Sequence, residues 1–158
     1  MAKKNFINIY NNLVKFSRNK LIFSSFTQKD TFSDRLIIFL FHFGFFLKEF
    51  KKNQDKELLQ EIFDYIFKEL EISIREIGYG DASINKKMKN YLNVFHSILD
   101  KVERWEAFSE KDKEEIFKSY VNFDGNLTYL IDYFEKYRKF LSKKPFHFFT
   151  KGVIKNNF

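Results

Sequence analysis

The sequence has no cysteine, and it has only one proline and five glycines among its 158 residues. Without cysteine the chain can form neither disulfides nor thiolate metal sites, and it offers no thiolate nucleophile. The lack of disulfides fits a cytosol-like compartment. Because tight turns draw on glycine and proline, their scarcity argues against a sandwich or barrel of many short strands.

Signatures of catalysis and of metal binding are also missing. The three histidines, His42, His96 and His147, lie in no HExxH pattern, and none follows a glutamate by three residues as a di-iron bundle requires. The only closely spaced glycines, Gly78 and Gly80, follow a helical pattern and not a strand, so they form no phosphate-binding loop. We therefore expect no enzyme, no metal, no cofactor and no small-molecule substrate.

No segment has the pattern of a membrane span or of a secretory signal. The most apolar stretch covers residues 36–50, and it is shorter than the roughly 20 residues that cross a bilayer. It also contains His42, Lys48 and Glu49, so we expect a buried helix. Residues 5–14 mix asparagine with apolar residues, and no small-residue cleavage site follows them. We expect a structural helix there as well.

Charge is distributed unevenly along the chain. Residues 1–29 carry six basic and no acidic side chains, residues 136–158 carry seven and none, and the segment between them has a net charge of −6. Two basic ends suit an anionic partner such as RNA or a phospholipid surface. Two solvated ends in a lysine-rich proteome would look the same, because net charge governs solubility and association and does not determine fold.

Apolar side chains recur at helical spacing through most of the sequence. The spacing predicts helices over residues 4–19, 34–51, 54–77, 84–107 and 109–121, and a last helix from about 127 that stops before Pro145. The second helix is apolar nearly all round, which places it at the centre of the domain. The final residues are apolar and basic without a regular period. We expect an all-α, single-domain bundle of about six helices over residues 1–145, with a tail over 146–158.

The expected helix ends have recognisable capping residues. Gly78 follows the third helix and can adopt the left-handed conformation of a helix C-terminus. Asp81 or Ser83 can cap the fourth helix by accepting hydrogen bonds from its first amides. Ser109 with Asp112 forms a capping box at the start of the fifth.

Two segments contain more than a generic helical domain requires. In the first, Asp30-Thr31 and Arg35 lead into the apolar helix that contains His42. In the second, residues 75–81 read Arg-Glu-Ile-Gly-Tyr-Gly-Asp, and they are followed by Ser83, Ile84, Lys86, Lys87, Lys89 and Phe95. Together these segments resemble the ubiquinol–cytochrome c chaperone family, the assembly factors of the respiratory cytochrome b–c1 complex. The resemblance covers roughly residues 5–140.

The sequence departs from the family pattern at three places. The family's proline before Asp-Thr is Lys29 here, and the acid two residues after the arginine is Ile37. The Tyr-Gly-Arg that follows the family's phenylalanine is replaced by residues 96–98, His-Ser-Ile. These departures bear on surface contacts more than on the fold.

The resemblance implies a non-enzymatic chaperone that binds newly made cytochrome b and helps its insertion, haem acquisition or handover. It further implies a partner assembly factor and work near the ribosome. The surplus of phenylalanine and the basic ends would also suit peripheral membrane contact. The expected location is the cytoplasm, including the cytoplasmic face of the inner membrane, or the matrix side in a eukaryote. The binding residues carried over are Arg35, His42, Arg75, Glu76, Gly78, Gly80, Asp81, Lys86, Lys87 and Lys89.

Several of these features have alternative interpretations. A histidine inside an apolar helix, as His42 is, is more typical of a hydrogen-bonded core residue than of a ligand. The segment 75–81 can fix the angle between two helices, or it can present Lys86, Lys87 and Lys89 to a client. The alternative function is a nucleic-acid or ribosome-binding helical module that uses the basic terminal segments. Steep loss of binding with salt would favour that second function.

Overall fold

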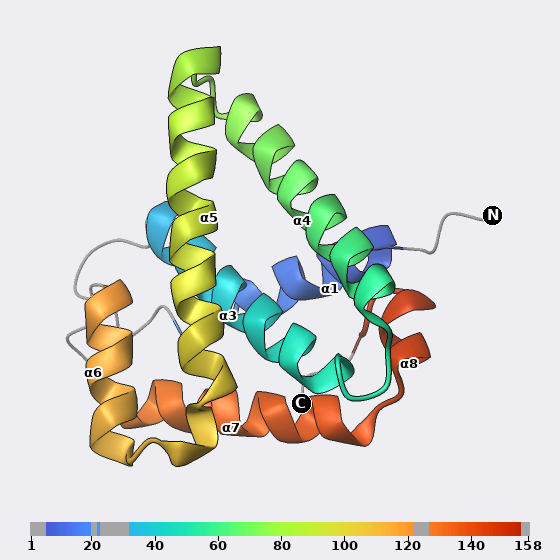
Figure 1. Ribbon diagram of the computed structural model, residues 1–158, viewed down its shortest axis with the longest axis vertical. Helices are drawn as coiled ribbons and strands as arrows, with labels where there is room; N and C mark the ends of the chain where they lie inside the picture. Colours follow the sequence, from blue (N-terminus) through green and yellow to red (C-terminus); the bar gives the residue numbers. More distant parts are fainter. Residues whose placement is uncertain (1–5, 20–21, 23–31, 122–126, 156–158) are drawn as a thin grey trace.

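The computed structural model describes residues 6–19, 22, 32–121 and 127–155. Within these ranges no strand occurs, so the fold is the all-α bundle that the sequence predicts (Figure 1). No helix in the same ranges combines the length and the hydropathy that a membrane crossing needs. The elements are α1 (Phe6–Ser17), α3 (Phe32–Phe50), α4 (Lys56–Glu76), α5 (Asp81–Glu103), the 3-10 helix η1 (Trp105–Ala107), α6 (Glu110–Tyr120), α7 (Leu127–Lys143) and α8 (Phe146–Thr150).

Helix α3 lies at the centre because apolar side chains occur on all its sides. It packs against α1, α5 and α7. Six of its apolar side chains are each at most 4% exposed, which confirms the predicted buried helix: Leu36, Ile38, Phe39, Phe41, Phe45 and Phe46.

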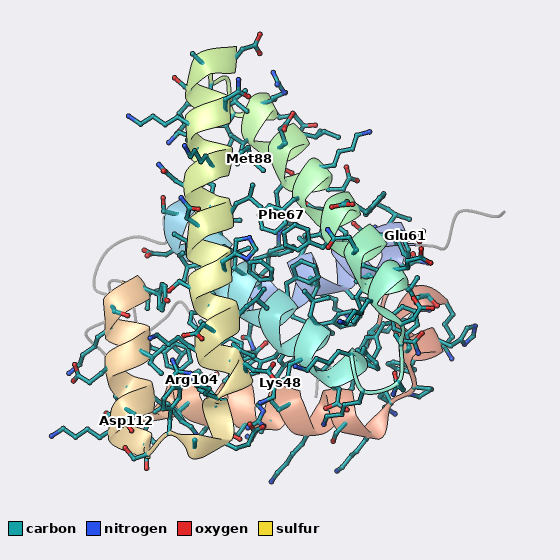
Figure 2. All side chains as sticks on the ribbon, viewed as in Figure 1. Lys48, Glu61, Phe67, Met88, Arg104 and Asp112 are labelled. Atoms are coloured by element: carbon teal, nitrogen blue, oxygen red, sulfur yellow. The ribbon has the colours of Figure 1, made fainter. Side chains whose placement is uncertain are left out.

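Helices α4 and α5 form a V whose arms meet at the segment between them and diverge over α3 (Figure 1). Each arm is amphipathic, and its apolar stripe faces the core. On α4, Phe67 points toward the interior while Glu61 points outward (Figure 2). The sequence predicts one helix over 84–107, but α5 ends at Glu103 and the chain continues as η1, whose Trp105 is fully buried.

A chain of ion pairs joins α3, η1, α6 and α7. Lys48 pairs with Glu106, and Arg138 bridges Glu106 and Glu135. Lys113 lies 3.4 Å from the same Glu135 carboxylate. Burial alone would raise the pKa of Glu106 and of Glu135. Glu106 accepts a hydrogen bond from Lys48, Glu135 accepts one from Trp105, and cations lie close to both. These interactions outweigh burial, so the pKa of each carboxyl is lowered.

The residues after Pro145 pack against α1 and contribute to the core. Asn12 donates its side-chain amide to the carbonyls of Phe149 and Gly152, both at 3.1 Å, and accepts from the Ile154 amide at 2.7 Å. Phe149 is 1% exposed. The short α8 was not predicted, because five residues are too few to show a helical period. The division of the chain at residue 145 stays a prediction.

Candidate functional site

The corner between α4 and α5 follows the predicted backbone pattern. Gly78 has φ +106°, and its amide donates to the Arg75 carbonyl at 3.0 Å. An L side chain is disfavoured at this φ, so the predicted left-handed glycine is confirmed. Gly80 has φ −74° and precedes the first residue of α5. Only the first of the two glycines therefore needs to be glycine for backbone reasons.

The predicted cap of α5 by Asp81 or Ser83 is wrong. Asp81 is the first residue of α5, and no side chain caps that helix start. Its carboxylate instead accepts from Arg75 at 2.5 Å across the corner, and Arg75 also reaches Glu71 at 3.4 Å. The hydrogen bond to Asp81 is the main reason that the pKa of Arg75 is raised. The Arg75–Asp81 ion pair therefore links the end of α4 to the start of α5.

The basic cluster beyond the corner is divided between two environments. Lys87 is partly buried, and its ammonium lies 4.4 Å from the centre of the Tyr79 ring. Lys86 and Lys89 are exposed and lie three residues apart on α5, so they share one helix face. Lys87 therefore packs on the corner, while the other two are available at the surface.

His42 is fully buried, and it offers no surface to a partner. Its Nδ1 lies 2.8 Å from the Ile38 carbonyl, which can only accept, so Nδ1 carries the proton. Nε2 then accepts from the Tyr133 hydroxyl at 2.6 Å, and Tyr137 donates to the His42 carbonyl at 2.9 Å. Burial lowers the pKa of His42 to about 3, although the hydrogen bond to Ile38 acts in the opposite direction. His42 is a neutral core histidine that ties α3 to α7.

A groove among α1, α3 and α4 brings two predicted residues together. Arg35 and Glu76, far apart in the sequence, both line this space of about 570 Å³. We call it the α1–α4 groove. Ile77, beside Glu76, lines it as well and is 51% exposed. The floor is apolar, and its side chains come from all three helices: Val14, Leu36, Phe39 and Leu70.

The other predicted residues lie away from the lining of this groove. Arg75, Gly78, Gly80 and Asp81 belong to the adjoining corner, and the three lysines follow on α5. Asp30 and Thr31, which contribute to the resemblance, lie outside the described residues. In the part of the chain that the structure describes, no three histidine, aspartate or glutamate side chains are grouped to hold a metal ion.

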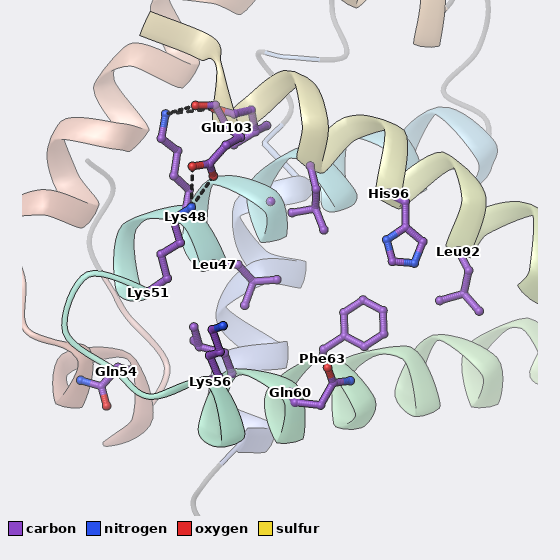
Figure 3. A pocket seen from close by; sticks show the side chains of 14 residues that line it. Leu47, Lys48, Lys51, Gln54, Lys56, Gln60, Phe63, Leu92, His96 and Glu103 are labelled. Atoms are coloured by element: carbon purple, nitrogen blue, oxygen red, sulfur yellow. Dashed lines mark hydrogen bonds and ion pairs between the residues drawn. The ribbon is translucent and has the colours of Figure 1, made fainter.

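A second and larger groove was missed by the sequence analysis. It measures about 870 Å³ and opens between α4 and α5, with the second half of α3 as its floor (Figure 3). We call it the α4–α5 groove. Its apolar lining includes Leu59, Phe63, Leu92 and Leu99. In the sequence these residues belong to apolar helix stripes, and periodicity alone does not separate a groove-facing position from a buried one.

The comparisons with known proteins identify a family. The model of the ubiquinol-cytochrome C chaperone family matches residues 24–144, a span that includes α3 to α7 and both segments that carry the resemblance. No curated protein matches, and no solved structure matches. The chain belongs to the ubiquinol-cytochrome C chaperone family. Membership in this family indicates that the chain acts as a chaperone in the assembly of a protein complex. It also implies that this role is non-enzymatic.

Proposed function

We propose that this chain, as a member of the ubiquinol-cytochrome C chaperone family, assists assembly of ubiquinol–cytochrome c reductase by binding newly made cytochrome b in the α1–α4 groove. The observation that carries the proposal is that Arg35 and Glu76 line one groove with an apolar floor. A newly made membrane protein exposes apolar segments that need cover until they are inserted or assembled. An apolar groove with a few polar groups at its edge suits that task.

The lining of the groove supports a division of labour between its floor and its rim. The floor residues Leu36 and Phe39 are at most 4% exposed, so the apolar surface open to a client comes mainly from the partly buried Val14 and the exposed Ile77. Arg35 and Glu76 are exposed and carry opposite charges. Charged groups at a rim fix the orientation of a bound segment more than they add affinity. Ile77 extends the apolar surface outward from the floor to the rim.

The corner of α4 and α5 has a positioning role in this proposal. The Arg75–Asp81 ion pair and the left-handed Gly78 fix where α4 ends. Glu76 and Ile77 are the last residues before that glycine, so the corner holds them in place at the rim. The exposed Lys86 and Lys89, further along α5, remain available for a partner assembly factor.

The proposal includes peripheral contact with an anionic membrane surface, at the cytoplasmic face of the inner membrane or the matrix side in a eukaryote. From residue 136 to 155 the chain has no acid, and its lysines are exposed. The ammonium groups of Lys144 and Lys151 lie 4.9 and 5.3 Å from the centre of the Phe148 ring. Lysines near an anionic leaflet each contribute roughly 1 kcal/mol to binding. Salt-sensitive binding to RNA with none to anionic vesicles would favour the nucleic-acid alternative.

A matched pair of substitutions, one within α4 and one at the residue that follows it, tests the client site. Ile77→Glu places a carboxylate on the groove, whereas Ile72→Glu makes the same change at a residue that is 42% exposed and does not line it. Both positions are exposed enough for the variants to fold, which thermal melts monitored by circular dichroism would verify.

The readouts are co-purification of cytochrome b from native membranes and the amount of assembled reductase. We expect the Ile77 variant to lose the client and lower assembly, and the Ile72 variant to resemble the unmodified chain. Equal cytochrome b recovery from both variants would contradict the proposed site.

A further inference from the structure

We propose that the α4–α5 groove binds a long-chain carboxylate, with the acyl chain on the apolar lining and the head group at the end near Lys56. This inference concerns different residues from the client groove and does not depend on the proposed function. It follows from three features of the groove, namely its apolar middle, its positively charged end and its volume.

The middle of the groove is apolar and is built from three helices. Leu47 comes from α3, Leu59 and Phe63 from α4, and Leu92 and Leu99 from α5. All five side chains are partly buried, because they pack on the core with one side and face the groove with the other. The volume of about 870 Å³ lies within the roughly 300–1,000 Å³ of small-molecule sites.

Gly44 of α3 forms part of the floor of the groove. A Cβ atom at this position would lie 3.5 Å from side-chain atoms of both Ile98 and Val102. These are ordinary van der Waals distances to α5, so a larger side chain would press against that helix. The glycine allows α3 and α5 to approach closely beneath the groove.

One end of the groove has an excess of positive charge, and the other end is mostly apolar. Lys48, Lys51 and Lys56 gather with one acid, Glu103, at the end where α3 turns into α4, whereas Phe63, Leu92 and the imidazole of His96 lie toward the other end (Figure 3). Helix α4 begins at Lys56, and the Asp55 carboxylate caps this helix start by accepting from the Leu58 amide at 2.8 Å, so the positive charge there comes from the lysine side chains. A ligand with a negative head and an apolar chain matches this gradient in charge.

Two of the three lysines are already engaged by acidic side chains. Lys48 pairs with Glu106 and donates to the Val102 carbonyl at 3.0 Å, and Lys51 pairs with Glu103 at 2.5 Å. Lys56 is exposed. It forms no ion pair with any residue that the structure describes. Lys56 is therefore the cation available to a ligand carboxylate.

The lining selects an acyl chain over more polar ligands. A nucleotide or sugar needs polar side chains that converge on it along its whole length. Here the polar side chains away from the lysine end are only Gln60 and His96, and Gln60 is engaged with Asp64 at 2.9 Å. A saturated acyl chain has no polar groups that need hydrogen bonds, and each methylene that it buries strengthens binding about fourfold.

Titration of the full chain with palmitate, followed by calorimetry, tests the inference. We expect saturable binding that weakens by up to about fourfold for each methylene removed in a series of shorter fatty acids. Lys56→Glu and Leu92→Glu should each weaken palmitate binding about tenfold or more, because they place a carboxylate at the head end and on the apolar lining. Lys86→Glu makes the same charge reversal on α5 outside the groove and should leave binding unchanged.

Several results would overturn the inference. These are no saturable binding, affinity that does not depend on chain length, or equal effects of Lys56→Glu and Lys86→Glu. Hexadecanol binding as tightly as palmitate would remove the role of the basic end. If Leu92→Glu fails to fold, Leu92→Gln replaces it. Ile77→Glu should bind palmitate normally, so loss of the client site and loss of this site can be told apart.

Discussion

Acidification should destabilise this protein through His42. The native imidazole is neutral with a pKa of about 3, whereas an unfolded histidine takes up a proton at about pH 6.5. Between these values the unfolded state binds one more proton than the native state. The free energy of unfolding therefore falls as pH falls through this window, and the stability is fully present above about pH 6.5.

The magnitude follows from the unfolded-state pKa alone as long as the native value lies well below the pH of the experiment. Moving from about pH 7.5 to about pH 5 should remove about 2 kcal/mol of stability through His42. Glu106 and Glu135 have lowered pKa values, so their contribution is present above an unfolded pKa of about 4.3 and is lost as pH falls below it. The window above about pH 5 thus isolates the histidine.

Urea unfolding at a series of pH values measures this effect. His42→Gln removes the titrating group while keeping a donor and an acceptor in the side chain. The variant can differ from the unmodified chain in overall stability without affecting the test. The quantity compared is the change in each protein's free energy of unfolding with pH. The unmodified chain should lose about 2 kcal/mol more than the variant between pH 7.5 and 5. Parallel curves for the two proteins would show that His42 titrates as in water and that the buried network is wrong.

Three further predictions concern the corner, the tail and the basic face. Gly78→Ala should cost ~1–2 kcal/mol in urea unfolding because of the left-handed φ, whereas Gly80→Ala should cost under about 1 kcal/mol. Asn12→Ala leaves three backbone groups of the tail without their partner, and should cost ~1–3 kcal/mol by the same assay. The triple variant Lys86/Lys87/Lys89→Ala should keep its melting temperature within a few degrees and lower the amount of assembled reductase, and normal assembly would confine this face to an architectural role.

Helix positions could be predicted from the sequence because they depend on local chemistry. The all-round apolar pattern of 36–50 placed α3 at the centre, and the Ser109–Asp112 capping box formed as expected, with both hydrogen bonds at 3.1 Å. Gly78 likewise needed only its position after the last apolar residue of a helix. In each case the residues involved are neighbours in the chain.

Features that depend on residues far apart in the sequence could not be predicted. Asp81 looked like a cap, but Arg75 is within reach across the corner and takes its carboxylate. No pattern in the sequence singles out Asn12, and only the fold shows that it holds the tail at Phe149 and Gly152.

The candidate site shows the same limit. Arg35 and Glu76 could be selected by family resemblance, but nothing in the sequence indicated that they line one groove. The α4–α5 groove depends on the angle at which two helices diverge, and no local pattern encodes that angle. Leu92 and Phe95 both lie on the apolar stripe of α5, yet only Leu92 lines this groove while Phe95 is fully buried.

Site-specific photo-crosslinking tests whether the α1–α4 groove holds newly made cytochrome b. A photoreactive residue is placed at Ile77 in one variant and at Ile72 in another, in cells that are synthesising cytochrome b. Both positions are exposed, Ile72 on α4 and Ile77 directly after it, but only Ile77 lines the groove. If the groove holds the client, we expect a crosslink to cytochrome b from position 77 that is much stronger than the one from position 72. Equal crosslinks from both positions, or a crosslink from position 72 alone, would contradict it.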